Sequence, residues 1–345
     1  MKFNAGSMKD SGQLGLADHL LNTRRKQSKM LSKLSKNDDL VNRRQVVNQI
    51  KVIDKTKSGK GGRPRKNPMW MIKAIFLQHL FNLSDPQLED QLIDRLSFQR
   101  FTGINLDQDI PDFTTFWRFK ESLIAHNLDQ KIFEEINAQI EGNGLLVKKG
   151  TIVDAAIIES SNRPLSHGKR QQLEEKTASQ IDTDARSTKK NNTWFFGYKG
   201  HIGVDIESKI IRKCTFTPAN VHDSTQTEHL VSYDEASLFG DKAYCNVRHK
   251  YSARRYGWYY GVLEKPDRGQ ILSKTQHKRN KQWSSVRGAV EHPFAHMKTK
   301  AGLTTMAAKN QARNGLRFVF NCIGWNLERM VFLVHRTRPV GSVAL

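Results

Sequence analysis

Between Met69 and Gly142, apolar residues recur every three or four positions, which is the spacing of one face of an α-helix. Ser84-Asp85-Pro86-Gln87 has the residues of a helix capping box, and Asp112 directly precedes another amphipathic run. Gly142-Asn143-Gly144 stops the last run. The pattern therefore predicts a small all-helical domain over residues 67–146.

After Gly144 the pattern changes to short β-branched and aromatic runs, which indicate strands. We expect strands over residues 151–158, 195–206, 209–217, a short run ending at 241, and 258–263. We expect helices near residues 228–234, 284–299 and 313–334, and a polar loop over about 160–193. Strands first and strand–helix alternation afterwards predict an α/β domain over residues 147–335, with a mixed sheet flanked by helices.

The first 66 of the 345 residues are polar and basic, so we expect an N-terminal arm there, with a helix around Leu40 to Ile53. Ser58 to Lys66 has the composition of a linker. Its Arg63 and Arg65 flank a proline, and an extended arm of this kind can also place arginine in an A·T-rich minor groove of DNA.

Positive charge is concentrated in two parts of a chain whose net charge is +22. Residues 1–66 carry 17 Lys and Arg against 5 Asp and Glu, and residues 248–313 carry 15 against 3. A surface selected only for solubility would mix its signs. Two basic segments flanking a slightly acidic middle predict a polyanionic partner, and we expect double-stranded DNA.

Three cysteines without C-x-x-C spacing indicate a reducing compartment and argue against a zinc site built on cysteine. The N-terminus lacks the apolar segment of a signal peptide. Polar residues interrupt the apolar stretch from Phe318 to Val334, which predicts a packed helix instead of a membrane span. We therefore expect a cytoplasmic protein.

Three acidic residues occur in unlike settings. Asp154 lies inside the apolar run Thr151 to Ile158, and Asp241 closes a short apolar run. Glu291 lies four residues after Arg287 and seven before Lys298, so a continuous helix would carry all three on one face. Burying a carboxylate among β-branched residues is costly unless it is paired or holds a metal. Convergence of Asp154, Asp241 and Glu291 on divalent cations would make a site that cuts phosphodiesters.

Several neighbouring residues could contact phosphate or border this site. Arg287 suits a bidentate contact with phosphate and Lys298 a point charge, although both could simply pair with Glu291. Lys189 and Lys190 lead into an expected strand and are candidate phosphate contacts, or a solvated charge run. His222 and Asp223 are secondary candidates for the border of the site.

The order of short sequence blocks resembles that of a known family. Arg287, Glu291 and Lys298 have the spacing R-x3-E-x6-K, which is the most specific block. The other blocks are Leu83 to Glu89, Asp94 to Phe98, Pro111 to Thr115, Gly197 to His201, Ala219 to Ser224, Gly240 to Tyr244 and Val286 to Phe294. Together they resemble the DDE transposases of bacterial insertion sequences, specifically the insertion-sequence-five branch. Two positions depart from the family pattern, Ser284 and Ala243, and neither removes a carboxylate.

The resemblance implies a ribonuclease H-like catalytic domain preceded by a helical domain for DNA binding or dimerisation. It implies binding of the element's terminal inverted repeats and of target DNA, a homodimer in the active complex, and Mg²⁺-dependent cleavage and strand transfer. Two Mg²⁺ ions, with Mn²⁺ as a substitute, would be held by Asp154, Asp241 and Glu291, with Asp154 bridging both. A hydrolytic nuclease on the same fold and a DNA-binding regulator that has lost activity remain alternatives.

Overall fold

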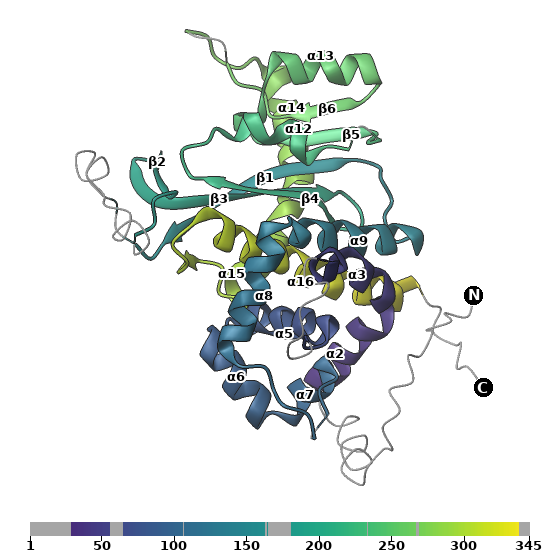
Figure 1. Ribbon diagram of the computed structural model, residues 1–345. Helices are drawn as coiled ribbons and strands as arrows, with labels where there is room; N and C mark the ends of the chain where they lie inside the picture. The colour runs from purple at the N-terminus through teal and green to yellow at the C-terminus, as the bar shows by residue number, and fades with distance from the viewer. Residues whose placement is uncertain are drawn as a thin grey trace. The chain divides into compact units, whose positions relative to one another are not determined.

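The computed structural model describes residues 29–55, 65–105, 107–162, 164, 181–232, 234–266 and 269–337. The chain divides into two compact units (Figure 1). The first unit takes its described residues from Met1–Gln78, Leu83–Gln139 and Met330–Leu345. The second unit takes its described residues from His79–Asn82 and Ile140–Arg329. Each unit is considered below by itself.

The first unit is built from helices. In chain order they are α2 (Lys29–Leu40), α3 (Arg43–Ile50), α4 (Val52–Lys55), α5 (Pro68–Leu80), α6 (Asp85–Asp94), α7 (Leu96–Thr102), α8 (Phe113–Ala125) and α9 (Leu128–Gly142). The predicted capping box is confirmed, because the Ser84 hydroxyl accepts from Gln87 N at 3.3 Å and the Gln87 side chain accepts from Ser84 N at 2.9 Å. Asp112 caps α8 in the same way, accepting from Thr115 N at 2.6 Å. Helix α2 was not predicted.

The second unit contains a seven-stranded mixed sheet. Its strands are β1 (Thr151–Ser160), β2 (Arg186–Lys190), β3 (Thr193–Asp205), β4 (Ile211–Pro218), β5 (Ser237–Gly240), β6 (Tyr259–Val262) and β7 (Thr305–Met306). They lie in the order β2-β3-β1-β5-β6, with β4 also pairing with β3 and β7 with β1. The remaining elements are η1 (Asp223–Gln226), α12 (Thr227–Leu230), η2 (Lys242–Tyr244), α13 (Val247–Tyr256), α14 (Lys274–Arg287), η3 (Gly288–Val290), α15 (Glu291–Lys300) and α16 (Gln311–Thr337).

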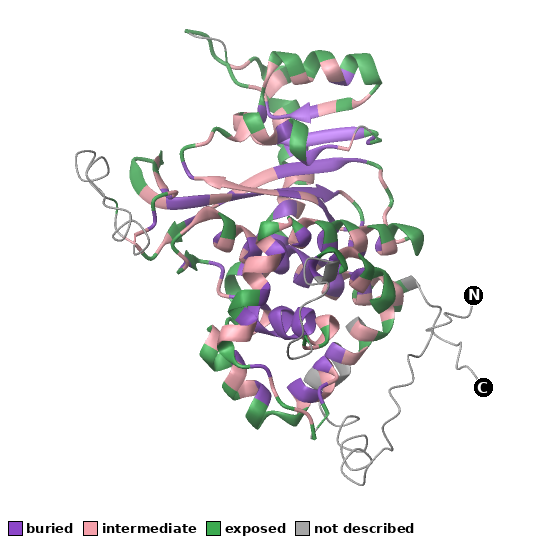
Figure 2. Cartoon of the chain, in the orientation of Figure 1, coloured by how far each residue is buried: buried purple, intermediate pink, exposed green. Residues whose placement is uncertain are grey.

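Strand β1 lies at the centre of the sheet. Its β-branched residues pack well on a pleated surface, and its first three residues are buried (Figure 2). It pairs antiparallel with β3 and parallel with β5, and β5 pairs parallel with β6. The last β1–β5 pair joins Val153 to Gly240. Two adjacent parallel strands therefore each continue directly into an aspartate, Asp154 and Asp241.

Different elements cover the two faces of the sheet. On one face, Val153, Leu230, Leu238 and Tyr244 form part of a buried cluster that joins β1 and β5 to α12 and η2. On the other face, the Phe318 ring of α16 lies so close to Gly200 of β3 that a Cβ there would stand 2.3 Å from the ring. Gly200 therefore allows α16 to approach the sheet closely, and a larger residue would force the helix away.

Helix α16 is a packed helix, as its sequence predicted. The buried side chain of Asn326 accepts from Ile211 N at 2.8 Å and donates to Ile211 O at 2.8 Å, which fixes the helix to the start of β4. These bonds explain why polar residues interrupt its apolar stretch. Among the described residues, no helix combines the length and apolarity needed to cross a membrane.

Two predicted features of this unit differ from the structure. The end of the expected polar loop forms strand β2, which pairs with the start of β3 over five residues. The sequence Arg-Ser-Thr-Lys-Lys has no apolar alternation, so only its partner reveals it as a strand. The helix expected over residues 228–234 is the single turn α12, and Val231 already has extended backbone.

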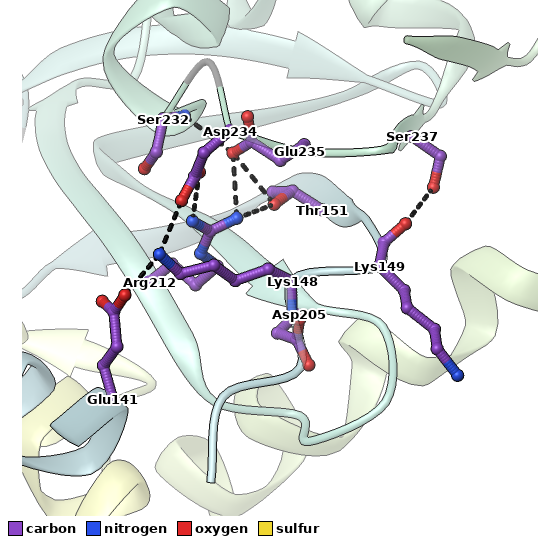
Figure 3. Close-up of polar contacts among 10 residues, drawn as sticks. All are labelled: Glu141, Lys148, Lys149, Thr151, Asp205, Arg212, Ser232, Asp234, Glu235 and Ser237. Carbon is purple, nitrogen blue, oxygen red and sulfur yellow. Dashed lines mark hydrogen bonds and ion pairs between the residues drawn. The ribbon is translucent and has the colours of Figure 1, made fainter. Parts of the chain in front are cut away.

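A buried polar network joins the start of β1 to β4 and to the segment before β5 (Figure 3). Arg212 of β4 donates to Glu235 Oε1 at 3.1 Å and to Asp234 Oδ1 at 2.6 Å. Thr151, the first residue of β1, donates its hydroxyl to Glu235 at 3.2 Å. Lys148 pairs with Asp234 at 2.7 Å. The side chains of Arg212 and Glu235 are 5% and 1% exposed, so each requires the other's charge.

We expect the substitution Arg212→Met to destabilise the protein by roughly 3–5 kcal/mol, because it leaves Glu235 as an uncompensated buried charge. The double variant Arg212→Met with Glu235→Gln should recover a large part of this loss, since the remaining amide is neutral. Urea unfolding measures both variants. Equal stabilities for the single and double variants would show that Glu235 does not depend on the arginine.

Candidate active site

Asp154 is a largely buried carboxylate on the central strand. Its side chain is 14% exposed, Oδ1 accepts from Ala155 N at 2.9 Å, and Oδ2 accepts from Arg287 Nη2 at 3.0 Å. Burial raises the pKa of Asp154, the Arg287 guanidinium opposes that rise, and the nearby charge of Asp241 adds to it. The protein thus holds an acid in surroundings that disfavour its ionisation unless a cation is close.

Asp241 follows β5 and caps the 3₁₀ turn η2, with its carboxylate accepting from Lys242 N. Its place is fixed by the parallel register, because Gly240 lies opposite Val153. A side chain at position 240 would meet Val153 Cγ2 at 3.0 Å, so glycine lets the two strands close up directly before their aspartates. This register sets Asp241 beside Asp154, and its charge raises the pKa values of both Asp154 and Arg287.

Glu291 is the first residue of α15, and Arg287 is the last residue of α14. The expectation of one continuous helix is therefore wrong for Arg287, because the 3₁₀ turn Gly288–Val290 separates the two helices, while Glu291 and Lys298 lie seven residues apart on α15 as expected. Pro293 gives the physical reason. At the third position of α15 its missing N–H has no intrahelical partner to lose, so the proline is tolerated only where a new helix begins.

Arg287 pairs with Asp154, and the charges of the other two predicted acids also act on it. Burial alone would lower its pKa, yet Asp154 first, and then Asp241 and Glu291, raise it above the ordinary arginine value. Its Nε is buried and has no hydrogen-bond partner among the described residues, so the guanidinium still has an unused donor. Arg287 therefore combines one direct contact, with Asp154, and one free N–H group.

The donor set is suited to hard divalent cations. Carboxylate oxygens are the ligands that Mg²⁺ and Mn²⁺ prefer. Within the described part of the chain, no three His, Cys, Asp or Glu side chains are gathered closely enough to hold one ion together. Asp154 and Asp241 are adjacent as a pair, so the residues fit ions that each take two protein carboxylates and complete their coordination with water and substrate oxygens.

The secondary candidates His222 and Asp223 lie beside this cluster, at the start of η1. Asp223 accepts from Lys199 Nζ at 2.8 Å, and Lys199 also donates to Val221 O at 2.9 Å. The exposed His222 caps η1 by accepting from Ser224 N at 3.3 Å. The contact of His222 with Ser224 favours a structural role for His222. The charge of Asp223, in contrast, acts on Tyr244.

Tyr244 is a residue of the site that the sequence did not reveal. It is 1% exposed, and its hydroxyl is buried without a hydrogen-bond partner. Burial raises its pKa well above the ordinary value, and the charges of Asp223, Asp154 and Asp241 raise it further. A protonated donor therefore stands unsatisfied close to three acids. Only its position three residues after Asp241 could have indicated this.

The remaining predicted DNA contacts are exposed side chains. Lys298 lies on α15, Lys189 and Lys190 lie on β2, and Arg65 precedes α5. Lys189 Nζ stands 5.9 Å from the centre of the Trp194 ring, and Trp194 is 68% exposed. Arg63 lies outside the described residues.

Comparisons with known proteins place this arrangement in context. A family model described as "Transposase DDE domain" matches residues 146–327, and a model described as "Transposase domain (DUF772)" matches residues 28–122. Among solved structures, the chain is similar to a piggyBac transposase in a synaptic complex with hairpin DNA, determined by cryo-EM. That similarity has 10% sequence identity and a TM-score of 0.40, over 85% of this chain and 72% of the other.

Proposed function

Because this chain belongs to the transposases that carry a DDE domain, we propose that it binds the terminal inverted repeats of its element and catalyses Mg²⁺-dependent strand cleavage and strand transfer. The observation that carries the proposal is the placement of Asp154 beside Arg287, at 3.0 Å, on a strand whose parallel neighbour leads directly into Asp241. A basic chain of net charge +22 supports DNA as the partner. The spacing R-x3-E-x6-K and the order of the other blocks support the insertion-sequence-five branch of bacterial elements.

The three acids act together in this proposal. Asp154, on the central strand, would hold Mg²⁺ together with Asp241 and Glu291. When bound, Mg²⁺ would supply activation of the attacking water or 3′-hydroxyl and stabilisation of the leaving oxygen. Arg287 then exchanges its contact with Asp154 for the phosphate beside the scissile bond, where its planar fork can bind two oxygens. The central antiparallel strands followed by parallel β5 and β6 support a ribonuclease H-like fold for this domain.

The proposal is tested with the full chain, a DNA duplex that ends in the element's repeat, and a plasmid target in Mg²⁺. We expect cleavage at the repeat, followed by joining of the released 3′-hydroxyl to the plasmid. Hydrolysed ends without joined products would identify a nuclease. Tight binding to the repeat without cleavage in Mg²⁺ or Mn²⁺ would identify a DNA-binding regulator.

We expect Tyr244→Phe to slow cleavage by about 10- to 100-fold, the loss of one hydrogen bond of roughly 1.5–3 kcal/mol to a charged oxygen. The hydroxyl is buried and has no partner within the described protein, so we infer that the residues covering it move when substrate binds and that it then donates to a negatively charged oxygen of the substrate. The thermal midpoint should stay equal or rise, because the substitution removes no internal hydrogen bond. A lower midpoint with an unchanged cleavage rate would assign the hydroxyl a purely structural role.

A further inference from the structure

Helix α13 carries an outward face that the rest of the described fold does not use. The helix begins at Asn246, whose side chain accepts from Arg248 N at 2.9 Å, and ends at Gly257 in a left-handed conformation. Its inner side is anchored by Ala253, which is buried, and by His249, whose side chain is 10% exposed. The α13 face, which points away from the sheet, consists of Val247, Arg248, Lys250, Tyr251, Arg254 and Arg255.

The α13 face has an apolar centre and cationic flanks. At 3.6 residues per turn, Val247 and Tyr251 lie four residues apart and form a ridge along the helix. They are 84% and 70% exposed, which is unusual for large apolar side chains without a partner. Lys250 and Arg254 lie on one side of the ridge. Arg248 and Arg255 lie on the other side.

These four cations are not neutralised within the described structure. Helix α13 contains no acidic residue, and none of the four forms an ion pair with another described residue. They also lie together at the edge of the sheet beside β6, where the outer side of the helix is exposed (Figures 1 and 2). Solvation by water explains why the cations are exposed, but it does not explain why the apolar ridge between them is exposed. A polyanionic partner that covers the ridge explains both.

We propose that α13 seats in the major groove of duplex DNA, with its two pairs of cations on the phosphates of opposite strands and the Val247–Tyr251 ridge on the floor of the groove. A helix with its side chains is about 10–12 Å across, and the major groove is about 12 Å wide. Apolar side chains on the floor of that groove contact the methyl group of thymine. This inference rests on the proposed function and adds a DNA-docking element to it.

The chain places this contact close to the scissile phosphate. Val247 follows Asp241 by six residues, which span at most about 20 Å. At about 3.4 Å per base pair, α13 therefore contacts the duplex within about six base pairs of the scissile phosphate at the proposed site. A second copy of the chain is a poorer occupant, because a symmetric interface would set the four cations of one α13 face against the same four in its partner.

Binding measured against salt tests the proposed docking, with a duplex extending twelve base pairs beyond the cleavage point. Replacing Arg248, Lys250, Arg254 and Arg255 by Gln should lower affinity about 10- to 100-fold near 0.1 M NaCl. It should also reduce the slope of log affinity against log salt by roughly two to four, about 0.9 for each phosphate that the protein no longer neutralises. A variant with lysine at the three arginine positions should keep the wild-type slope. The matched control replaces four exposed cations elsewhere in the described chain, Lys36, Lys51, Lys131 and Lys309, and should change affinity less than threefold.

A separate binding experiment tests the Val247–Tyr251 ridge. Replacing thymine by deoxyuridine within six base pairs of the cleavage point removes methyl groups only, and should weaken binding of the wild type severalfold. The double variant Val247→Ser with Tyr251→Ser should bind both duplexes equally. If the quadruple Gln variant binds like its matched control while the wild type binds and cuts, the docking of α13 is wrong and the proposed function stands. If the wild type neither binds nor cuts repeat DNA, both are wrong.

Discussion

Asp154→Asn is expected to lower the rate of strand cleavage by about a thousandfold or more. The substitution replaces a carboxylate that the proposal places among the Mg²⁺ ligands, and metal-ion stabilisation of transition-state charge is worth several kcal/mol, with each 1.36 kcal/mol a factor of ten. Asparagine is nearly identical in size, so the packing of β1 should not change. Single-turnover cleavage of a repeat-ended duplex in Mg²⁺ measures the effect.

The matched controls separate lost chemistry from lost structure. Binding of the same duplex should stay within a few-fold of the wild type. Burial raises the pKa of Asp154, the charge of Arg287 lowers it, and the charge of Asp241 raises it further, so that the pKa is above its ordinary value. A raised pKa in the folded state contributes stability at acid pH that is lost as pH rises through that pKa. Without metal, the thermal midpoint of Asp154→Asn should therefore be equal to or below that of the wild type at acid pH. At neutral pH it should be above that of the wild type. If this variant cleaves DNA at the wild-type rate, Asp154 is not part of the catalytic site.

Arg287→Gln is expected to slow cleavage by about 10²–10³-fold, which is the usual cost of removing one preorganised donor to developing negative charge. It should also destabilise the metal-free protein, because Asp154 loses its paired cation and Asp241 and Glu291 lose a positive charge that acts on them. Arg287→Lys should restore most of the stability and less of the rate, since an ammonium lacks the planar fork of the guanidinium. Cleavage rates and thermal midpoints, each with and without Mg²⁺, measure these effects.

Two comparisons make the Arg287 result specific. Mg²⁺ should narrow the stability difference between Arg287→Gln and the wild type, because the ions neutralise the same carboxylates. Lys298→Gln is the matched variant, an exposed cation on α15, and should weaken DNA binding with little change in stability. A destabilisation of Arg287→Gln that Mg²⁺ leaves unchanged would mean that the ions bind elsewhere.

Local sequence signals predicted much of the fold. The β-branched run around Asp154 became β1, and the short run before Asp241 became β5. The capping box at Ser84 was readable because its partners lie three residues apart. Pro293 cannot lie inside a regular helix, so the sequence predicts either a kink there or a helix that begins close to Glu291, and α15 does begin at Glu291. The spacing of Arg287 and Glu291 suggested a continuous helix, and the 3₁₀ turn between them brings both charges to the same cluster by another route.

Features that depend on residues far apart in the sequence could not be predicted from local sequence patterns. Strand β2 is polar and is defined by its pairing with β3. The charge pair of Arg212 and Glu235 joins residues 23 positions apart, and neither side chain indicates burial by its type. Tyr244 resembles an ordinary core aromatic in sequence, and only its unsatisfied hydroxyl beside the acids distinguishes it.

The central claim is that Asp154, Asp241 and Glu291 together hold one pair of divalent ions. Iron(II) can replace Mg²⁺ among oxygen ligands and, with ascorbate and peroxide, cuts the peptide backbone beside the place where it is bound. We predict three cuts in the wild type, near residues 154, 241 and 291, each suppressed by excess Mg²⁺ and all weakened together in Asp154→Asn. Cuts near only one of these residues, or a pattern that Asp154→Asn leaves unchanged, would contradict a shared metal site.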